Sequence, residues 1–126
     1  MIPGSNSDHP DFRKSFLFAI HGFRIAVTTE RNIKVMLAVG ACAIVGGLAL
    51  QIDLLSWAII LLCCGVVIMA ELFNTAIETV VDLVSPEFHP LAGRAKDIAA
   101  AAVWVLSFLV AIVGILVFLN AILSRL

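Results

Sequence analysis

A polar stripe with three carboxylates continues a hydrophobic segment in the middle of the chain. It consists of two glutamates, an aspartate, an asparagine and a threonine: Glu71, Asn74, Thr75, Glu78 and Asp82. At 100° per residue, their offsets of 0, 3, 4, 7 and 11 place them within an arc of about 100° on one helix face. Such a stripe beside a hydrophobic segment is costly unless something pairs with it, so it predicts a functional site.

The stripe offers oxygen ligands alone, because no histidine or cysteine lies on its face. Oxygen ligands favour Mg²⁺ or Ca²⁺ over zinc, and Mg²⁺ typically shares its remaining positions with substrate phosphates. Lys96, farther along the chain, is a cation that could meet the same phosphates. Together, an acidic cluster, a divalent cation and a lysine favour a nucleotide-phosphate site of the kind that phosphoryl transfer needs.

Three interpretations of the stripe stay open from the residues alone. It can be a nucleotide or metal site, a proton or ion relay in a transporter, or a structural contact between helices. The sequence has no Gly-x-x-x-x-Gly-Lys-Ser/Thr phosphate loop, since Gly93-Arg94-Ala95-Lys96 is too compressed to be one. The residues by themselves therefore predict a divalent-cation site and do not name a reaction.

The elements that position the stripe follow from the distribution of charge. The 126 residues allow one domain, and a composition of 62% hydrophobic and 13% charged residues is far from that of a soluble protein. Three stretches carry no Asp, Glu, Lys or Arg: 35–52, 54–70 and 98–124. Because about 20 apolar residues span a bilayer, we predict an all-α membrane protein with transmembrane helices at 33–52, 54–84 and 97–124. The second of these extends beyond the membrane and carries the stripe.

The segment before the first span is predicted to hold a surface helix. Residues 1–9 are short, polar and expected to be flexible, and Pro10 is a plausible first helical residue, capped by Asp8 or His9. Within residues 10–29, apolar side chains recur every three to four positions: Phe12, Phe16, Ile20, Phe23 and Val27. The result is a basic amphipathic helix suited to the membrane surface, although packing on a partner protein is an alternative. His21 on this helix is expected to face water or lipid headgroups.

The placement of lysine and arginine predicts the topology. Of the eight such residues, seven lie before or at the start of the first span or between the second and third spans, and Arg125 alone lies in the tail. Positive charge marks the cytoplasmic side, so the N-terminus and the 71–97 region are expected inside and the C-terminus outside. The formal net charge of −1 gives no sign of a nucleic-acid partner, and none is expected.

Small residues in the first span indicate a helix-packing face. Gly40, Gly46 and Gly47 let neighbouring backbones approach closely in lipid. Three cysteines lie inside predicted spans, and we expect them to pack without a metal: Cys42, Cys63 and Cys64.

The connections between the spans carry less information. Asp53 lies in a connection of a few residues, and we expect it to serve the turn without a chemical role. Residues 85–93 are predicted to form a loop or short kinked helix, because Pro86 cannot continue the preceding helix. His89 in this segment either caps the loop, faces solvent or contacts a nucleotide.

Two motifs resemble one known family. The stretch Ala70-Glu71-Leu72-Phe73-Asn74-Thr75-Ala76-Ile77-Glu78, followed by Val81-Asp82, is similar to the signature of the small prokaryotic diacylglycerol kinases and undecaprenol kinases. The second motif of that family resembles His89-Pro90-Leu91-Ala92-Gly93-Arg94-Ala95-Lys96-Asp97. Thr29-Glu30-Arg31-Asn32 stands where the family carries an acidic residue before the first span, and the resemblance covers about residues 12 to 120.

The resemblance implies a lipid kinase of the bacterial cytoplasmic membrane that uses ATP and Mg²⁺. It also implies a homotrimer whose active sites are shared between subunits. By position, Glu71 would be the general base, and Glu30 and Glu78 would hold the Mg²⁺ ions that bridge the ATP phosphates. Asn74 would orient the site. Three residues would lie on the nucleotide side: Asp82, Lys96 and Asp97.

The lipid and the role of Glu30 are less determined by the sequence. The resemblance favours undecaprenol slightly over diacylglycerol, so the product would feed cell-envelope or phospholipid metabolism. Glu30 has the alternative of being an ordinary interfacial charge paired with Arg31 or Lys34. A non-enzymatic membrane subunit, or a proton or ion relay built on the stripe, is the alternative to a kinase.

Overall fold

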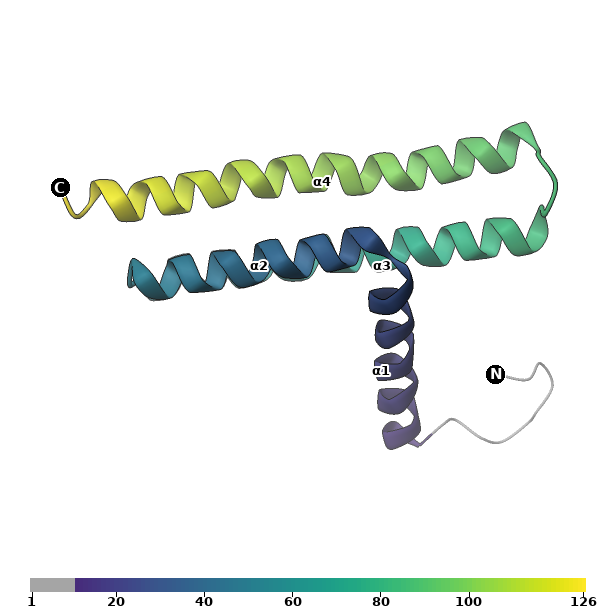
Figure 1. The fold of residues 1–126 in the computed structure, drawn as a ribbon, viewed down its shortest axis with the longest axis horizontal. Coiled ribbons are helices and arrows are strands. Elements are labelled where there is room, and N and C mark those ends of the chain that lie inside the picture. The colour runs from purple at the N-terminus through teal and green to yellow at the C-terminus, as the bar shows by residue number, and fades with distance from the viewer. Residues whose placement is uncertain (1–10) are drawn as a thin grey trace.

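The computed structural model describes residues 11–126, and within them the chain forms four helices (Figure 1). They are α1 (Phe12–Thr29), α2 (Arg31–Ala49), α3 (Leu54–Val84) and α4 (Pro90–Leu123). By length and composition, α2, α3 and α4 can each cross a membrane. The predicted all-α architecture with three membrane-crossing helices is therefore confirmed. The flexible segment expected at 1–9 and the helix start expected at Pro10 lie outside the described residues, and α1 begins at Phe12 with Asp11 at the N-cap position.

The three long helices run side by side, and α1 points away across their direction (Figure 1). Helix α3 contacts each of the other three helices. It forms an antiparallel pair with α4, whereas α2 accompanies the first part of α3 and the second part extends beyond it (Figure 1). The stripe predicted from the sequence lies on this second part of α3.

One extended residue separates α1 from α2. Glu30, with φ −99° and ψ 119°, is at once the C-cap of α1 and the N-cap of α2. Its backbone N–H donates to the Ala26 carbonyl at 2.8 Å and so closes α1. The change of chain direction between the surface helix and the first long helix thus occurs at a residue that the sequence marks as a candidate ligand.

The α2–α3 connection is a tight turn. Gln51 takes a positive φ of 47°, and Asp53 caps α3 by accepting a hydrogen bond of 2.7 Å from the Ser56 backbone N–H. This hydrogen bond lowers the pKa of the Asp53 carboxyl. Asp53 therefore has the turn role expected of it. At the chain end, the Arg125 guanidinium donates to the Leu50 carbonyl and ties α4 to the turn.

The α3–α4 connection is shorter than the sequence indicated. Helix α3 ends at Val84, before Pro86, but α4 begins at Pro90 and not near residue 97. Proline suits the first helical position, because the N–H that it lacks would be unpaired there and its fixed φ already fits a helix. His89 is the N-cap, and its Nδ1 accepts from the Leu91 N–H at 3.2 Å. The expected loop or kinked helix over 85–93 is thus corrected: its last four residues form the first turn of α4.

The small residues of α2 allow the close packing expected of them. A Cβ built on Gly47 would lie 2.9 Å from Trp57 Cη2 and 3.0 Å from Ile52 Cδ1, and one on Gly46 would lie 3.3 Å from Phe118 Cε1. Next to these contacts, Ile52, Ile60 and Val117 form a buried apolar cluster. The three helices therefore pack closely at the end that carries the α2–α3 turn.

Two of the three cysteines pack inside the bundle and one does not. Cys63 and Cys64 are half-buried, whereas Cys42 is exposed. The expectation that all three thiols pack holds for Cys63 and Cys64 on α3. It is wrong for Cys42 on α2 within a single chain, because Cys42 lies on the face of α2 turned away from α3 and α4.

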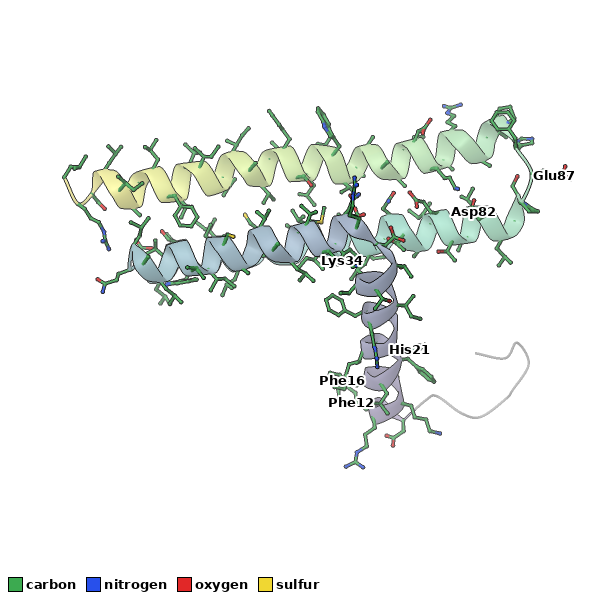
Figure 2. The ribbon with its side chains drawn as sticks, viewed as in Figure 1. Phe12, Phe16, His21, Lys34, Asp82 and Glu87 are labelled. Carbon is green, nitrogen blue, oxygen red and sulfur yellow. The ribbon has the colours of Figure 1, made fainter. Side chains whose placement is uncertain are left out.

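Most of the apolar surface of the helices is not covered by the chain itself. At most 17% of the apolar window of each long helix is buried. Helix α1 likewise exposes Phe12 and Phe16, which are 86% and 62% accessible (Figure 2), and its His21 is exposed as expected. A hydrophobic medium or other chains must cover such a surface.

Candidate active site

Burial decreases along the predicted stripe. The Glu71 side chain is 1% exposed and Asn74 is 8% exposed, whereas Glu78 is half-buried and Asp82 is exposed. Asp82 lies on the part of α3 that continues toward the α3–α4 connection (Figure 2). A buried carboxylate costs free energy unless it is paired. The stripe therefore runs from an enclosed end at Glu71 to an open end at Asp82.

Three buried side-chain atoms on the stripe have no hydrogen-bond partner within residues 11–126: Glu71 Oε2, Asn74 Oδ1 and Thr75 Oγ1. They belong to positions 0, 3 and 4 of one helix face, so they are neighbours. Native proteins rarely leave buried polar atoms unpaired, and each such atom calls for an explanation. Three together mark this part of the stripe as a candidate site for a further polar group.

The enclosed end of the stripe meets the corner between α1 and α2. Asn32, Glu30 and Glu78 are the polar side chains near enough to affect the Glu71 carboxyl electrostatically. Ile33, beside Asn32, is fully buried. The structure thus places Glu30 and Glu78 each within electrostatic range of Glu71. The sequence reasoning missed Asn32, and its one signal was its position two residues after Glu30.

Glu30 is not neutralised by its sequence neighbours. Within residues 11–126 it forms no ion pair with Arg31 or Lys34. Lys34 Nζ instead donates to the Thr28 carbonyl at 3.2 Å. The interpretation of Glu30 as an ordinary paired interfacial charge therefore finds no support in the structure.

Asn74 links two parts of the stripe. Its Nδ2 donates to Glu78 Oε1 at 3.1 Å, one helical turn further along α3. This hydrogen bond fixes one Glu78 oxygen and leaves Asn74 Oδ1 unpaired. Asn74 is thus placed to orient Glu78.

The open end of the stripe is joined to α4 by an ion pair. Lys96 Nζ lies 2.5 Å from Asp82 Oδ1. Asp97, next along α4, is exposed. The structure therefore brings Lys96 to Asp82, whereas it gives Asp97 no partner in the described part of the chain. His89 is occupied as the N-cap of α4, which is the capping role among the alternatives for this residue.

The donor set suits a hard cation, although residues 11–126 do not complete a metal cage. No group of three or more His, Cys, Asp or Glu side chains within residues 11–126 converges as a metal cage. The oxygens of Glu30 and Glu78 are hard ligands that carry charge, and Mg²⁺ is usually held by one or two carboxylates plus substrate phosphates. The residues present thus fit an ion that is shared with a nucleotide.

An apolar groove opens between the three long helices beside the stripe. It has a volume of about 440 Å³. Val35 and Met36 of α2 and Val67 of α3 line one end, and Ile60 and Phe118 line the other. Val67 lies one helical turn before Glu71, so the groove begins next to the enclosed end of the site.

Comparison with known proteins places this arrangement in a family. Residues 17–118 match the family described as prokaryotic diacylglycerol kinase. An undecaprenol kinase of Bacillus subtilis (strain 168) is 41% identical over 108 residues, which cover 86% of this chain and 88% of that protein. A diacylglycerol kinase of Synechocystis sp. is 37% identical over 106 residues, which cover 83% of this chain and 61% of that protein. A diacylglycerol kinase of Helicobacter pylori (strain 26695) is 35% identical over 89 residues, 71% of this chain and 70% of that protein.

The chain belongs to the prokaryotic diacylglycerol kinase family. It is a multi-pass membrane protein and a lipid kinase. The resemblance inferred from the two motifs is confirmed.

Proposed function

We propose that this protein transfers the γ-phosphoryl group of ATP to the hydroxyl of a membrane lipid, with Mg²⁺ as the cofactor. The observation that carries the proposal is the buried Glu71 carboxyl, whose Oε2 has no partner within residues 11–126 and which lies beside Glu30 and Glu78. A lipid hydroxyl that donates to Oε2 would satisfy that oxygen. Kinase reactions need such an acceptor to take the proton of the attacking alcohol.

Glu71 is the general base in this proposal. It lies at the enclosed end of the stripe, one turn from the apolar groove, where a lipid hydroxyl arrives from the bilayer. A carboxylate shielded from water accepts the hydroxyl proton as the oxygen attacks the phosphorus atom. Thr75, whose Oγ1 is also unpaired, lies on the same face and offers the one hydroxyl among the three unpaired groups.

Glu30 and Glu78 would hold Mg²⁺. The ion, when bound, neutralises charge on the ATP phosphates and fixes their position. Asn74 orients the Glu78 carboxylate through its 3.1 Å hydrogen bond. Asn32 is placed to orient Glu71.

Asp82, Lys96 and Asp97 form the nucleotide side. Lys96 is the cation available for phosphate oxygens, and Asp82 holds its ammonium group over α3. Asp97 is exposed and free to contact the nucleotide. Phosphates arriving from the open end of the stripe would meet these residues before they reach Glu78.

Undecaprenol is the lipid that we propose, with diacylglycerol as the second candidate. The undecaprenol kinase of Bacillus subtilis matches a larger share of this chain, at higher identity, than the diacylglycerol kinases of Synechocystis and Helicobacter pylori do. The product would be a lipid phosphate for cell-envelope or phospholipid metabolism.

The setting that we propose is the bacterial cytoplasmic membrane, with the stripe on the cytoplasmic side and the C-terminus outside. Seven of the eight lysines and arginines support this orientation. We further propose a homotrimer with shared sites. The large apolar surface that the described residues leave uncovered supports it.

The test uses purified protein in lipid nanodiscs with radiolabelled ATP and Mg²⁺, offered undecaprenol and diacylglycerol in parallel. Label is expected in the lipid phosphate, faster with undecaprenol, and is expected to be lost with Glu71→Gln. Phosphorylation of neither lipid would contradict the kinase proposal. Nucleotide-free proton or ion flux in proteoliposomes, abolished by the same substitution, would favour the relay instead.

A further inference from the structure

The apolar groove between α2, α3 and α4 has features that the phosphoryl-transfer chemistry does not use. Apart from Ser107, its walls are apolar side chains and cysteines. The groove points toward the candidate site, because Val67 in its lining stands one helical turn from Glu71. Along α2, Val35 and Met36 at the same end follow Asn32 by one turn. A molecule whose polar end rests on Glu71 would therefore extend its apolar part into this groove.

Phe118 and Ile60 stand at the end of the groove that lies nearest the α2–α3 turn. Phe118 of α4 lines it there and packs on α2, since a Cβ on Gly46 would lie 3.3 Å from its ring. Ile60, on the same end, belongs to the buried cluster with Ile52 and Val117. The groove thus reaches from Val67, one turn from Glu71, to Ile60 and Phe118 on the side of the α2–α3 turn.

The walls of the groove leave room for a thin chain. Four small residues line it: Gly40 and Ala43 of α2, and Ala111 and Gly114 of α4. A Cβ on Gly114 would meet no atom within 4 Å, and one on Gly40 would meet only Cys64 Sγ at 3.5 Å. Side chains of larger volume at these positions would occupy the groove without striking backbone.

We propose that this groove binds the hydrocarbon chain next to the reacting hydroxyl of the lipid alcohol, and that Phe118 sets how many carbons it accepts. The proposal rests on the lipid kinase function proposed above and specifies the part of the substrate that is recognised. From Glu71 to Ile60 the helical rise is about 16 Å, which matches roughly thirteen bonds of an extended chain, or about three isoprene units. The remainder of a longer lipid leaves through the open side of the groove into the bilayer.

Binding in the groove would speed the reaction by positioning the lipid hydroxyl. Lipid tails already surround the chain in the membrane, so entering the groove brings little hydrophobic free energy. Contact with the walls instead holds the hydroxyl against Glu71, and a correctly held hydroxyl reacts faster. The prediction is therefore a dependence of kcat/KM on chain length that stops once the groove is full.

The test compares polyprenols of one, two, three, four and eleven isoprene units as substrates in nanodiscs. For the wild type, kcat/KM is expected to rise about tenfold from one unit to about three or four and then to stay level. Gly114→Phe should reduce the ratio of kcat/KM for four units to that for one unit to about twofold or less. Phe118→Ala should move the level region to a chain at least one unit longer. A ratio within one variant is not changed by partial loss of folded protein.

Gly65→Phe is the matched control. Gly65 is exposed on α3 and does not line the groove, and a Cβ added there would meet no atom within 4 Å, so the same bulk is added outside the groove. It should keep the wild-type ratio. The KM for ATP should be alike in wild type and both glycine variants.

A second measurement does not depend on turnover. A polyprenol with a diazirine on its third isoprene unit should label α4 between Ser107 and Phe118 or α3 between Ile60 and Val67, and undecaprenol should compete. Labels confined to other faces of α4, with competition absent, would overturn the proposal. So would cross-linking results that show a second copy of this chain filling the groove.

The outcomes separate this inference from the proposed function. If no lipid alcohol is phosphorylated by the wild type, the kinase proposal itself fails. If the wild type is active but kcat/KM is the same for all chain lengths, or Gly114→Phe and Gly65→Phe behave alike, only the groove proposal fails.

Discussion

Lys96 of α4 and Asp82 of α3 form an ion pair across the open end of the polar stripe, with 2.5 Å between Nζ and Oδ1. Their side chains are 36% and 64% exposed, so solvent screens the pair and its contribution to stability is small, about 0–1 kcal/mol. An accessible ammonium held in one place is better suited to meeting phosphates than to holding the fold.

Lys96→Met should therefore affect catalysis more than stability. Hydrogen bonds to charged groups contribute about 1.5–3 kcal/mol, so kcat/KM for ATP should fall roughly 10- to 100-fold. The melting temperature in detergent should change little. Asp82→Asn is the companion variant, because it frees the ammonium without removing it. Equal kinetics for Lys96→Met and wild type would exclude Lys96 from nucleotide binding.

Glu71→Gln should abolish most turnover while the protein stays folded. A general base contributes about 10²–10⁴-fold, and glutamine keeps the shape of the side chain but takes no proton. Because the Glu71 carboxyl is 1% exposed with one oxygen unpaired, removal of its charge should not lower the thermal stability. Single-turnover kinetics and thermal unfolding check both parts. A variant that keeps more than a tenth of wild-type kcat would contradict the base role.

Asn74→Ala should weaken the response to Mg²⁺. Without its 3.1 Å hydrogen bond, one oxygen of Glu78 loses its fixed position, so half-maximal activity should need several-fold more Mg²⁺. Thr79→Ala is the control, since its hydroxyl bonds the Thr75 carbonyl on the exposed side of α3. Titration of Mg²⁺ at saturating ATP distinguishes the two. A similar shift in both variants would point to a general effect on the helix.

Gly47→Ala should lower stability, and Gly65→Ala should raise it. The added methyl group at Gly47 would lie 2.9 Å from the rigid Trp57 ring, and overpacking costs about 1–3 kcal/mol. A methyl group added at Gly65 would have no atom within 4 Å, so the gain in helix propensity of about 1 kcal/mol is not offset by a clash. Thermal unfolding of Gly47→Ala and Gly65→Ala in the same detergent compares the stability of the two variants. Trp57→Phe should rescue Gly47→Ala, and failure of that rescue would show that the contact is not the cause.

Asp53 should make stability depend on acid pH. Its pKa is lowered in the folded chain by the Ser56 hydrogen bond, so the cap stabilises fully above the unfolded value of about 3.9 and is lost as pH falls through the lower folded value. Asp53→Asn keeps a capping oxygen that does not titrate. The difference in melting temperature between pH 6 and pH 3 should therefore shrink in this variant. An unchanged difference would assign the acid sensitivity to other carboxylates.

Periodicity and charge predicted much of the fold. The uncharged runs mark the three long helices because membrane helices must exclude charge, and α3 occupies Leu54–Val84 because the stripe keeps helical spacing up to the break before Pro86. The early start of α4 is not evident from the same signals. Pro90 is compatible with a loop, whereas a proline with a capping residue before it also begins a helix.

The site was predictable along one helix and less so between helices. Glu71, Asn74, Thr75 and Glu78 share a face that spacing alone identifies. The approach of Asn32 to Glu71 depends on how the chain turns at Glu30, and that turn has no periodic signature. The choice of Asp82 as the partner of Lys96 depends likewise on the crossing of α3 and α4.

Helix α3 joins the span and the polar stripe without a break. Glu71 stands 17 residues after Leu54, a rise of about 26 Å, while the hydrocarbon core of a bilayer is about 30 Å thick. The length of α3 between Leu54 and Glu71 therefore fixes the depth of the Glu71 carboxylate in the membrane. In the proposed reaction the lipid hydroxyl sits at a depth set by the bilayer, so membrane thickness and helix tilt would determine whether that hydroxyl reaches Glu71. The enzyme's alignment with its substrate is thus a property of the protein and the membrane together.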